Sequence, residues 1–266
     1  MTRDECLRRI TDVLERDERV RAAWLAGSLG RGAGDELSDL DLVVVVAEPE
    51  LAAFADSWVA AVSEQVPVVL HQRLNADPVI VLNQVSEEWI RFDLSVVSPE
   101  GAVTRDPATM VKLFDRDCVE RTLTGQSHPL PPSGPRVASL TQEFMRVLGL
   151  LPVVLGRKEL EVGASGSGLI RTMLVQLMLE DAFVPDRRGA MTLREVLREE
   201  HLQILRGLPP IDATMESIVA VHVAVARAFL PLARRLIEQT AQDWPTSLEE
   251  ALRRHLDRTL DLQLSW

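Results

Sequence analysis

The spacing of apolar positions gives the first part of the chain a mixed texture. Apolar residues recur at helical spacing over 4–16 and again over 49–63. Short β-rich runs lie around these segments, at 21–26, 40–46, 66–70, 79–85 and 89–97. Helices and strands that alternate in this way predict an α/β unit built around a small mixed sheet.

The second part of the chain has a helical texture only. Residues 125–136 form a linker, because four prolines fall within the eleven residues from Gly125 to Pro135. The segment 163–168, rich in Gly and Ser, is interpreted as a flexible break before a helix. Helical periodicity covers 137–155, 168–183, 192–206, 214–239 and 247–262. The predicted fold class is therefore α+β, with a catalytic α/β domain over 1–130 and an α-helical bundle over 137–266.

Composition narrows the setting of the protein. With 46% hydrophobic and 26% charged residues, the 266-residue chain has the balance of a globular protein. Its longest purely apolar run, Leu42 to Ala47, is far shorter than the roughly 20 residues that cross a bilayer, so we expect no membrane association. The first residues carry charges of both signs, unlike a signal peptide. Two cysteines outside any metal-binding pattern, Cys6 and Cys118, favour a reducing cytoplasm.

The net charge of −11 is distributed unevenly. Residues 1–130 hold 13 Arg or Lys against 23 Asp or Glu, a net of −10, whereas residues 131–266 hold 16 against 17, a net of −1. An acidic domain repels a nucleic-acid backbone, so we expect no nucleic-acid partner. The same charge suits a site that gathers divalent cations or a cationic small molecule.

Two acidic residues lie in a segment that otherwise has the pattern of a buried strand. Asp39 and Asp41 are two positions apart, so they share one face of a strand while Leu40 and Leu42 share the other. Neighbouring carboxylates repel each other, and a bound Mg²⁺ ion removes that repulsion. The alternative is an edge strand with two solvent-facing acids, which the apolar run after Leu42 disfavours.

A glycine-rich loop precedes this acidic pair. Its glycines stand at 27, 30, 32 and 34, a spacing that matches neither G-x-G-x-x-G nor a Walker A loop. Exposed backbone N–H groups of Gly27, with the Ser28 hydroxyl and the Arg31 charge, could hold phosphates, and Ser38 is a further candidate nucleotide-binding residue. A third carboxylate, Asp93, lies in the middle of the run 89–97 and would complete a site for two metal ions.

The combination of these motifs resembles the DNA polymerase β-type nucleotidyltransferase superfamily. Gly27-Ser28, Asp39-Leu-Asp41 and Asp93 on a later strand match its Gly-Ser turn, acid-x-acid pair and third acid, over roughly residues 5–100. Within the superfamily the chain is most similar to two-domain lincosamide and aminoglycoside nucleotidyltransferases. In the helical half, Gly156-Arg-Lys-Glu resembles a basic-Gly-Glu stretch of such enzymes, although no Gly stands between Lys158 and Glu159. The resemblance makes Glu159 a candidate acceptor-binding or base residue, with a helix-end charge cluster as the alternative.

The resemblance implies that an acceptor hydroxyl attacks the α-phosphorus of a Mg²⁺-bound nucleoside triphosphate and releases pyrophosphate. Asp39 and Asp41 would be metal ligands, and Asp93 either a third ligand or the base. The acceptor would be a small, antibiotic-like molecule in a cleft between the domains, and the helical domain is also a candidate surface for a homodimer. Two alternatives remain open: the same core could adenylylate a protein, or it could bind nucleotide as a sensor without catalysis.

Overall fold

A computed structural model describes residues 1–126, 130–183 and 193–260. The chain divides into two compact units, Met1–Ser127 and His128–Trp266. The first unit combines a sheet with helices and the second is helical, so the predicted α+β class is confirmed.

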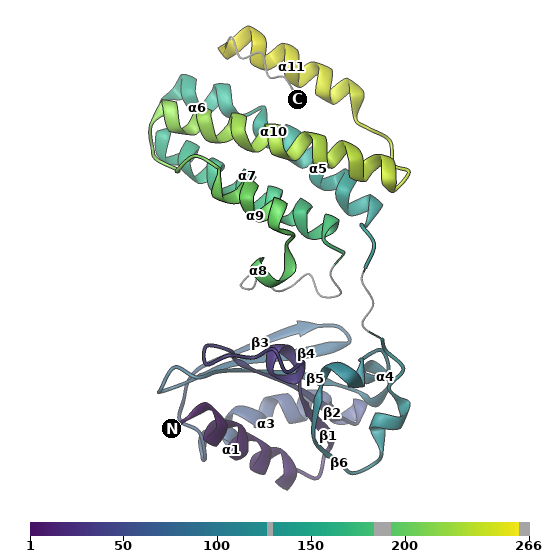
Figure 1. Ribbon diagram of the computed structural model, residues 1–266. Coiled ribbons are helices and arrows are strands. Elements are labelled where there is room, and N and C mark those ends of the chain that lie inside the picture. Colours follow the sequence, from purple (N-terminus) through teal and green to yellow (C-terminus); the bar gives the residue numbers. More distant parts are fainter. Residues whose placement is uncertain (127–129, 184–192, 261–266) are drawn as a thin grey trace. The chain divides into compact units, whose positions relative to one another are not determined.

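A six-stranded mixed sheet forms the centre of the first unit (Figure 1). The strand order across it is β3-β4-β5-β2-β1-β6. Neighbouring strands are antiparallel except for β2 and β5, which run parallel at the middle of the sheet. The strands are β1 (Val20–Leu25), β2 (Leu40–Val46), β3 (Val68–Ala76), β4 (Val79–Ser86), β5 (Arg91–Val97) and β6 (Val111–Asp115).

Two helices, α1 (Arg3–Arg16) and α3 (Leu51–Ser63), lie on one side of this sheet (Figure 1). Thr2 caps α1 by accepting the backbone N–H of Glu5 at 3.2 Å, which satisfies one of the free donors at the helix start. The apolar faces of both helices pack on alternate strand residues, including Leu40, Leu42 and Phe92. This layer is the main core of the unit.

Apolar residues of the first unit cover one end of the opposite face of the sheet. Val43, Val45 and Val97 pack there against the short helix α4 (Pro99–Ala102) and the 3₁₀ turn η3 (Val119–Thr122). Because side chains alternate along a strand, this is also the face of Asp41 and Asp93, which precede the covered valines on β2 and β5. Two further turns complete the unit: η1 (Glu48–Glu50) and η2 (Pro107–Thr109).

The second unit is a bundle of helices around one apolar core (Figure 1). The long helices α5, α7 and α10 form its centre, and Phe144 and Phe229 stack there with ring centroids 3.8 Å apart. Its helices are α5 (Gly134–Leu148), α6 (Leu151–Arg157), α7 (Leu160–Asp181), α8 (Leu193–Val196), α9 (Glu199–Arg206), α10 (Met215–Gln239) and α11 (Thr246–Leu260).

One local prediction from the sequence is wrong, and one strand was missed. The Gly- and Ser-rich segment 163–168 is not a flexible break, because it lies inside α7. A small residue is needed at position 163, because a Cβ atom at Gly163 would approach the Cδ1 atom of Ile218 on α10 to 2.6 Å. The strand β6 was not predicted, since its five residues alternate only weakly between apolar and polar.

Three helical segments of the second unit are long and apolar enough to cross a membrane, judged by length and composition: 134–157, 160–181 and 215–239. Scattered charges and small residues interrupt them, so a search for uninterrupted apolar runs does not find them. About two fifths of each segment is buried inside the bundle. Part of the remaining apolar surface is exposed on α6 and α7, at residues such as Val153 and Val162.

Candidate functional site

Parallel pairing of β2 with β5 brings the three predicted acids together. Asp41 and Asp93 are direct neighbours in the ladder, so their side chains emerge on the same face of the sheet. Asp39 is two residues before Asp41 and shares that face. One carboxylate oxygen from each of the three lies within 4.8 Å of the others. Leu40 and Leu42 are buried on the other side, which fixes the register of the acids.

The glycine-rich segment begins with a turn that fits against Asp41. Gly27 opens the one-turn helix α2 (Gly27–Gly30) with a φ of +62°, a left-handed conformation that favours glycine. A Cβ atom built at Gly27 would lie 2.7 Å from the Cγ of Asp41 and overlap its carboxylate. The backbone N–H of Ala26 donates to the carbonyl oxygen of Asp41 at 2.7 Å. Glycine at position 27 therefore leaves the room that the Asp41 carboxylate occupies.

Negative charge is concentrated at this site. Burial, followed by the charges of Asp41 and Asp39, raises the pKa of Asp93 to about 6. Arg91 works in the opposite direction and lies close to Asp39, with its Nη2 atom 3.6 Å from the Asp39 Oδ2 atom.

The donor set fits a divalent cation. Three carboxylates from two adjacent strands supply hard oxygen ligands, which Mg²⁺ prefers. Burial is the largest cause of the raised pKa of Asp93, and the neighbouring charges of Asp41 and Asp39 add to it by repulsion. A cation would relieve this repulsion.

The remaining predicted residues have separate surroundings. Ser28 follows Gly27 in α2, and Arg31 is exposed at the end of that turn. Ser38 closes a turn by donating its hydroxyl to the Oδ1 atom of Asp35 at 2.9 Å, so it is already bonded within the loop before β2. Glu159 belongs to the helical unit, where it is exposed at the junction of α6 and α7.

Sequence reasoning missed Asn83, a residue that lies beside the acids. Asn83 on β4 pairs directly with Asp93 on β5, and Gln72 on β3 pairs with Asn83, so polar side chains continue from the acids across the sheet. The Oδ1 atom of Asn83 is buried without a hydrogen-bond partner among the described residues. A polar residue at the centre of a β-rich run was the available signal, but only the strand pairing shows that it neighbours Asp93.

A second group of possible metal ligands, Asp181, Glu200 and His201, lies in the helical unit. Both oxygens of the Asp181 carboxylate accept hydrogen bonds from Arg235, at 2.8 and 2.9 Å, and Arg198 also bonds to it. Two guanidinium groups on one buried carboxylate neutralise its charge and repel a cation. This group is therefore an ion-pair network of the bundle and not a metal site.

Comparisons with known structures find full-length similarity at low identity. The chain is similar to an aminoglycoside 6-adenyltransferase from Bacillus subtilis, with 14% identity, a TM-score of 0.45, and coverage of 96% of this chain and 97% of that one. A CCA-adding enzyme from Thermotoga maritima, complexed with tRNA, gives 10% identity and a TM-score of 0.32 over 98% of this chain and 92% of the enzyme. Terminal uridylyl transferase 4 from Trypanosoma brucei, with bound GTP, gives 16% identity and a TM-score of 0.29 over 85% of this chain and 64% of the transferase.

These TM-scores are too low to carry an argument about function. A search of curated proteins finds no match to the chain. A protein-family model gives the decisive comparison. The model described as streptomycin adenylyltransferase matches residues 1–259 and thus includes both units. With an acid-x-acid pair, a third acid and a Gly-Ser turn in one site, and with a family match over nearly the whole chain, the protein belongs to the streptomycin adenylyltransferase family of nucleotidyl-transferring enzymes.

Proposed function

We propose that the protein transfers a nucleoside monophosphate from a Mg²⁺-bound nucleoside triphosphate to a hydroxyl group of a small, antibiotic-like acceptor and releases pyrophosphate. The observation that carries this proposal is the meeting of Asp39, Asp41 and Asp93 within 4.8 Å beside the Gly27 turn. Membership of an adenylyltransferase family supports the reaction class. A cytoplasmic setting would supply both the nucleotide and the metal.

The reaction exchanges one phosphorus–oxygen bond for another. The acceptor oxygen forms a bond to the α-phosphorus, the bond from that phosphorus to the pyrophosphate oxygen breaks, and the hydroxyl proton leaves the acceptor. Mg²⁺, when bound, neutralises charge on the triphosphate and on the leaving pyrophosphate. Asp39 and Asp41 would hold the metal, and the backbone of Gly27 with the hydroxyl of Ser28 would hold the phosphate tail.

Asp93 has two roles open to it: it can complete a second metal site, or it can accept the proton of the acceptor hydroxyl. The variant Asp93→Asn separates them. If Asp93 is a ligand, the variant loses the thermal stabilisation that Mg²⁺ with a non-hydrolysable nucleotide gives the wild type. If Asp93 is the base, that stabilisation remains while transfer is lost. Asp39→Asn serves as the control that loses both.

The charge of the first unit favours a cationic acceptor. Residues 1–130 carry a net charge of −10, whereas the rest of the chain is close to neutral. A cationic molecule is attracted to such a surface, and salt screens the attraction at distances beyond about 10 Å at 0.1 M ionic strength. Acceptors with several amino groups, such as aminoglycosides, should therefore show a KM that rises with salt, whereas a neutral acceptor should not.

Incubation of the purified protein with α-labelled ATP or GTP, Mg²⁺ and a panel of aminoglycosides, lincosamides and sugars tests the proposal. We expect label on one class of acceptor, pyrophosphate in equal amount, and no reaction in Asp39→Asn. Label on the protein itself or on an added protein, with the panel unlabelled, would instead establish protein adenylylation. Bound nucleotide without any transfer would establish a sensor.

A further inference from the structure

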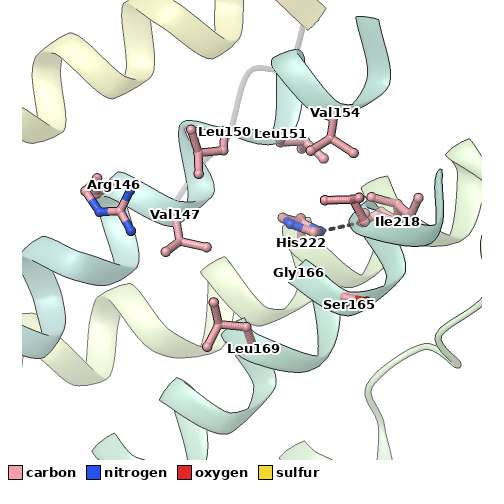
Figure 2. A pocket seen from close by; sticks show the side chains of 12 residues that line it. Arg146, Val147, Leu150, Leu151, Val154, Ser165, Gly166, Leu169, Ile218 and His222 are labelled. Atoms are coloured by element: carbon pink, nitrogen blue, oxygen red, sulfur yellow. Dashed lines mark hydrogen bonds between the residues drawn. The ribbon is translucent and has the colours of Figure 1, made fainter. Parts of the chain in front are cut away.

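A cavity of about 320 Å³ lies in the helical unit, between α5, α6, α7 and α10 (Figure 2). Its size is at the lower end of the range for small-molecule sites. The walls are mostly aliphatic, with Val147, Leu151 and Ile218 among them. At the rim, Leu150, Val162 and Leu169 keep 45%, 56% and 50% of their surface exposed. A molecule in the cavity would cover apolar surface that otherwise faces water.

His222 is the one lining polar side chain that is buried, with only 4% exposed. Its Nδ1 atom lies 2.8 Å from the carbonyl oxygen of Ile218. A carbonyl oxygen can only accept, so Nδ1 carries the proton and donates. Burial lowers the pKa of His222, so the ring is neutral. The other ring nitrogen, Nε2, is then an unprotonated acceptor.

This acceptor has no partner among the described residues, and the other polar groups of the lining are occupied. The Arg146 guanidinium donates to Glu143 at 2.6 and 2.7 Å, and the Ser165 hydroxyl donates to the Glu161 carbonyl at 3.0 Å. In Figure 2 the imidazole lies among the lining side chains, with the bond to Ile218 on one side of the ring and Nε2 on the other. A donor on a ligand in the cavity would supply the hydrogen bond that this acceptor lacks within the described part of the chain.

Glycine at position 166 keeps the cavity open. Gly163 and Gly166 both line it from α7, but only at Gly163 would a side chain meet a neighbour, Ile218. A Cβ atom at Gly166 would meet nothing within 4 Å. Alanine there would favour the helix by roughly 1 kcal/mol and fill part of the space. Helix packing therefore explains the glycine at 163, whereas at 166 the glycine leaves room for a ligand.

We propose that this cavity binds a neutral, mainly apolar small molecule that carries a hydroxyl or N–H group, and that this group donates a hydrogen bond to the Nε2 atom of His222. Aliphatic walls disfavour a charged ligand, because an ion would lose its hydration and the charged lining side chain, Arg146, is already paired with Glu143. A carboxylate or carbonyl oxygen is also disfavoured at this position, because it can only accept a hydrogen bond and the Nε2 atom of His222 is itself an acceptor. The inference does not rest on the proposed transferase activity.

The test uses the full-length protein and two probes that differ in one donor. Indole has an N–H group and N-methylindole does not. Calorimetric titration should show indole binding about tenfold more tightly than N-methylindole, the ratio expected for one net hydrogen bond. In His222→Leu the two probes should bind equally. The ¹⁵N resonance of His222 Nε2 should shift with indole and not with N-methylindole.

A pair of variants on α7 locates the binding. Gly166→Leu fills the cavity. Gly168→Leu places the same side chain two residues away, where a Cβ atom also meets nothing within 4 Å but the residue does not line this cavity. Both gain the same helix propensity, so their difference reports on the cavity alone. Indole binding should be lost in the first variant and kept in the second.

Three results would overturn the proposal: no binding of either probe to the wild type, equal binding of indole to Gly166→Leu, or equal affinity of the two probes for the wild type. Sedimentation of the ligand-free protein tests whether a second copy of the chain, and not a small molecule, occupies the cavity. A dimer that Gly166→Leu dissociates and Gly168→Leu does not would make the cavity a self-association surface and would also overturn the proposal.

Discussion

Gly27→Ala is the most direct perturbation of the proposed metal site, because it changes Asp41 without altering its chemistry. A Cβ atom at position 27 would overlap the Asp41 carboxylate and lie 2.7 Å from its Cγ and 2.9 Å from its Cβ. The backbone of Gly27 is held between the end of β1 and the strand that carries Asp41, since the preceding Ala26 bonds to Asp41. The carboxylate must therefore rotate away from Asp39 and Asp93.

The substitution has two effects: backbone strain lowers the unfolding free energy, and the displaced Asp41 carboxylate lowers the rate of transfer. A second glycine, Gly32, allows the two effects to be measured separately. Alanine at a φ of +62° costs about 1–2 kcal/mol of unfolding free energy through backbone strain alone. Gly32 has a similar φ of +71°, but a Cβ atom there would meet nothing within 4 Å. Gly32→Ala should therefore show the backbone strain without the displaced carboxylate. A reacting group moved by about 1 Å can cost roughly 100-fold in rate.

We expect Gly27→Ala to transfer nucleotide at least about 100-fold more slowly than Gly32→Ala, with unfolding free energies of the two variants within about 1 kcal/mol of each other. Pyrophosphate release measures the first quantity and denaturant titration the second. Melting with and without Mg²⁺ and a non-hydrolysable nucleotide should show stabilisation in Gly32→Ala only. A Gly27→Ala rate within about threefold of the Gly32→Ala rate would refute the assignment of Asp41 to the metal.

Further predictions concern three other positions. Asn83→Leu should raise the KM of the acceptor substrate and leave the KM of the nucleotide unchanged in steady-state kinetics. Melting should show no fall in Tm, because the change removes a buried amide oxygen that has no described hydrogen-bond partner. Ser28→Ala should weaken nucleotide binding in calorimetry by about 1.5–3 kcal/mol at most, and an unchanged Kd would place the phosphates elsewhere. The pKa of His222 is lowered in the folded state, so the unfolded chain binds more protons as the pH falls below about 6.5 and stability falls with it; the loss of unfolding free energy between about pH 7.5 and 5.5 should be smaller in His222→Phe.

The site was predictable from the sequence as far as local periodicity reaches. Alternation along one strand places Asp39 and Asp41 on the same face, and the buried Leu40 and Leu42 confirm that geometry. The link to Asp93 needed more, since Asp93 stands 52 positions after Asp41 in the chain. The helix α3 and the strands β3 and β4 lie between them. Resemblance to a superfamily supplied that link, and the parallel pairing of β2 with β5 provides its physical basis.

Contacts between strands were beyond the reach of the sequence. Asn83 neighbours Asp93 because β4 turns back and pairs with β5 in one particular register. A shift of one residue would move Asn83 to the opposite face of the sheet, where Leu82 and Gln84 are buried. Hydrophobic patterning fixes the face of each residue within a strand, but many registers satisfy it for two neighbouring strands. This neighbour of the three clustered acids could therefore not be named from the sequence.

The glycines of α7 show a different limit. In the sequence, Gly163 and Gly166 look alike, and a cluster of Gly and Ser has the composition of a flexible segment. Tertiary packing overrides that composition, because α7 continues through both residues and lies against α10. At Gly163 the small residue permits close contact with Ile218, and at Gly166 it leaves a cavity beside His222. The same residue type therefore serves two purposes on one helix, and only the atoms on the facing helix distinguish them.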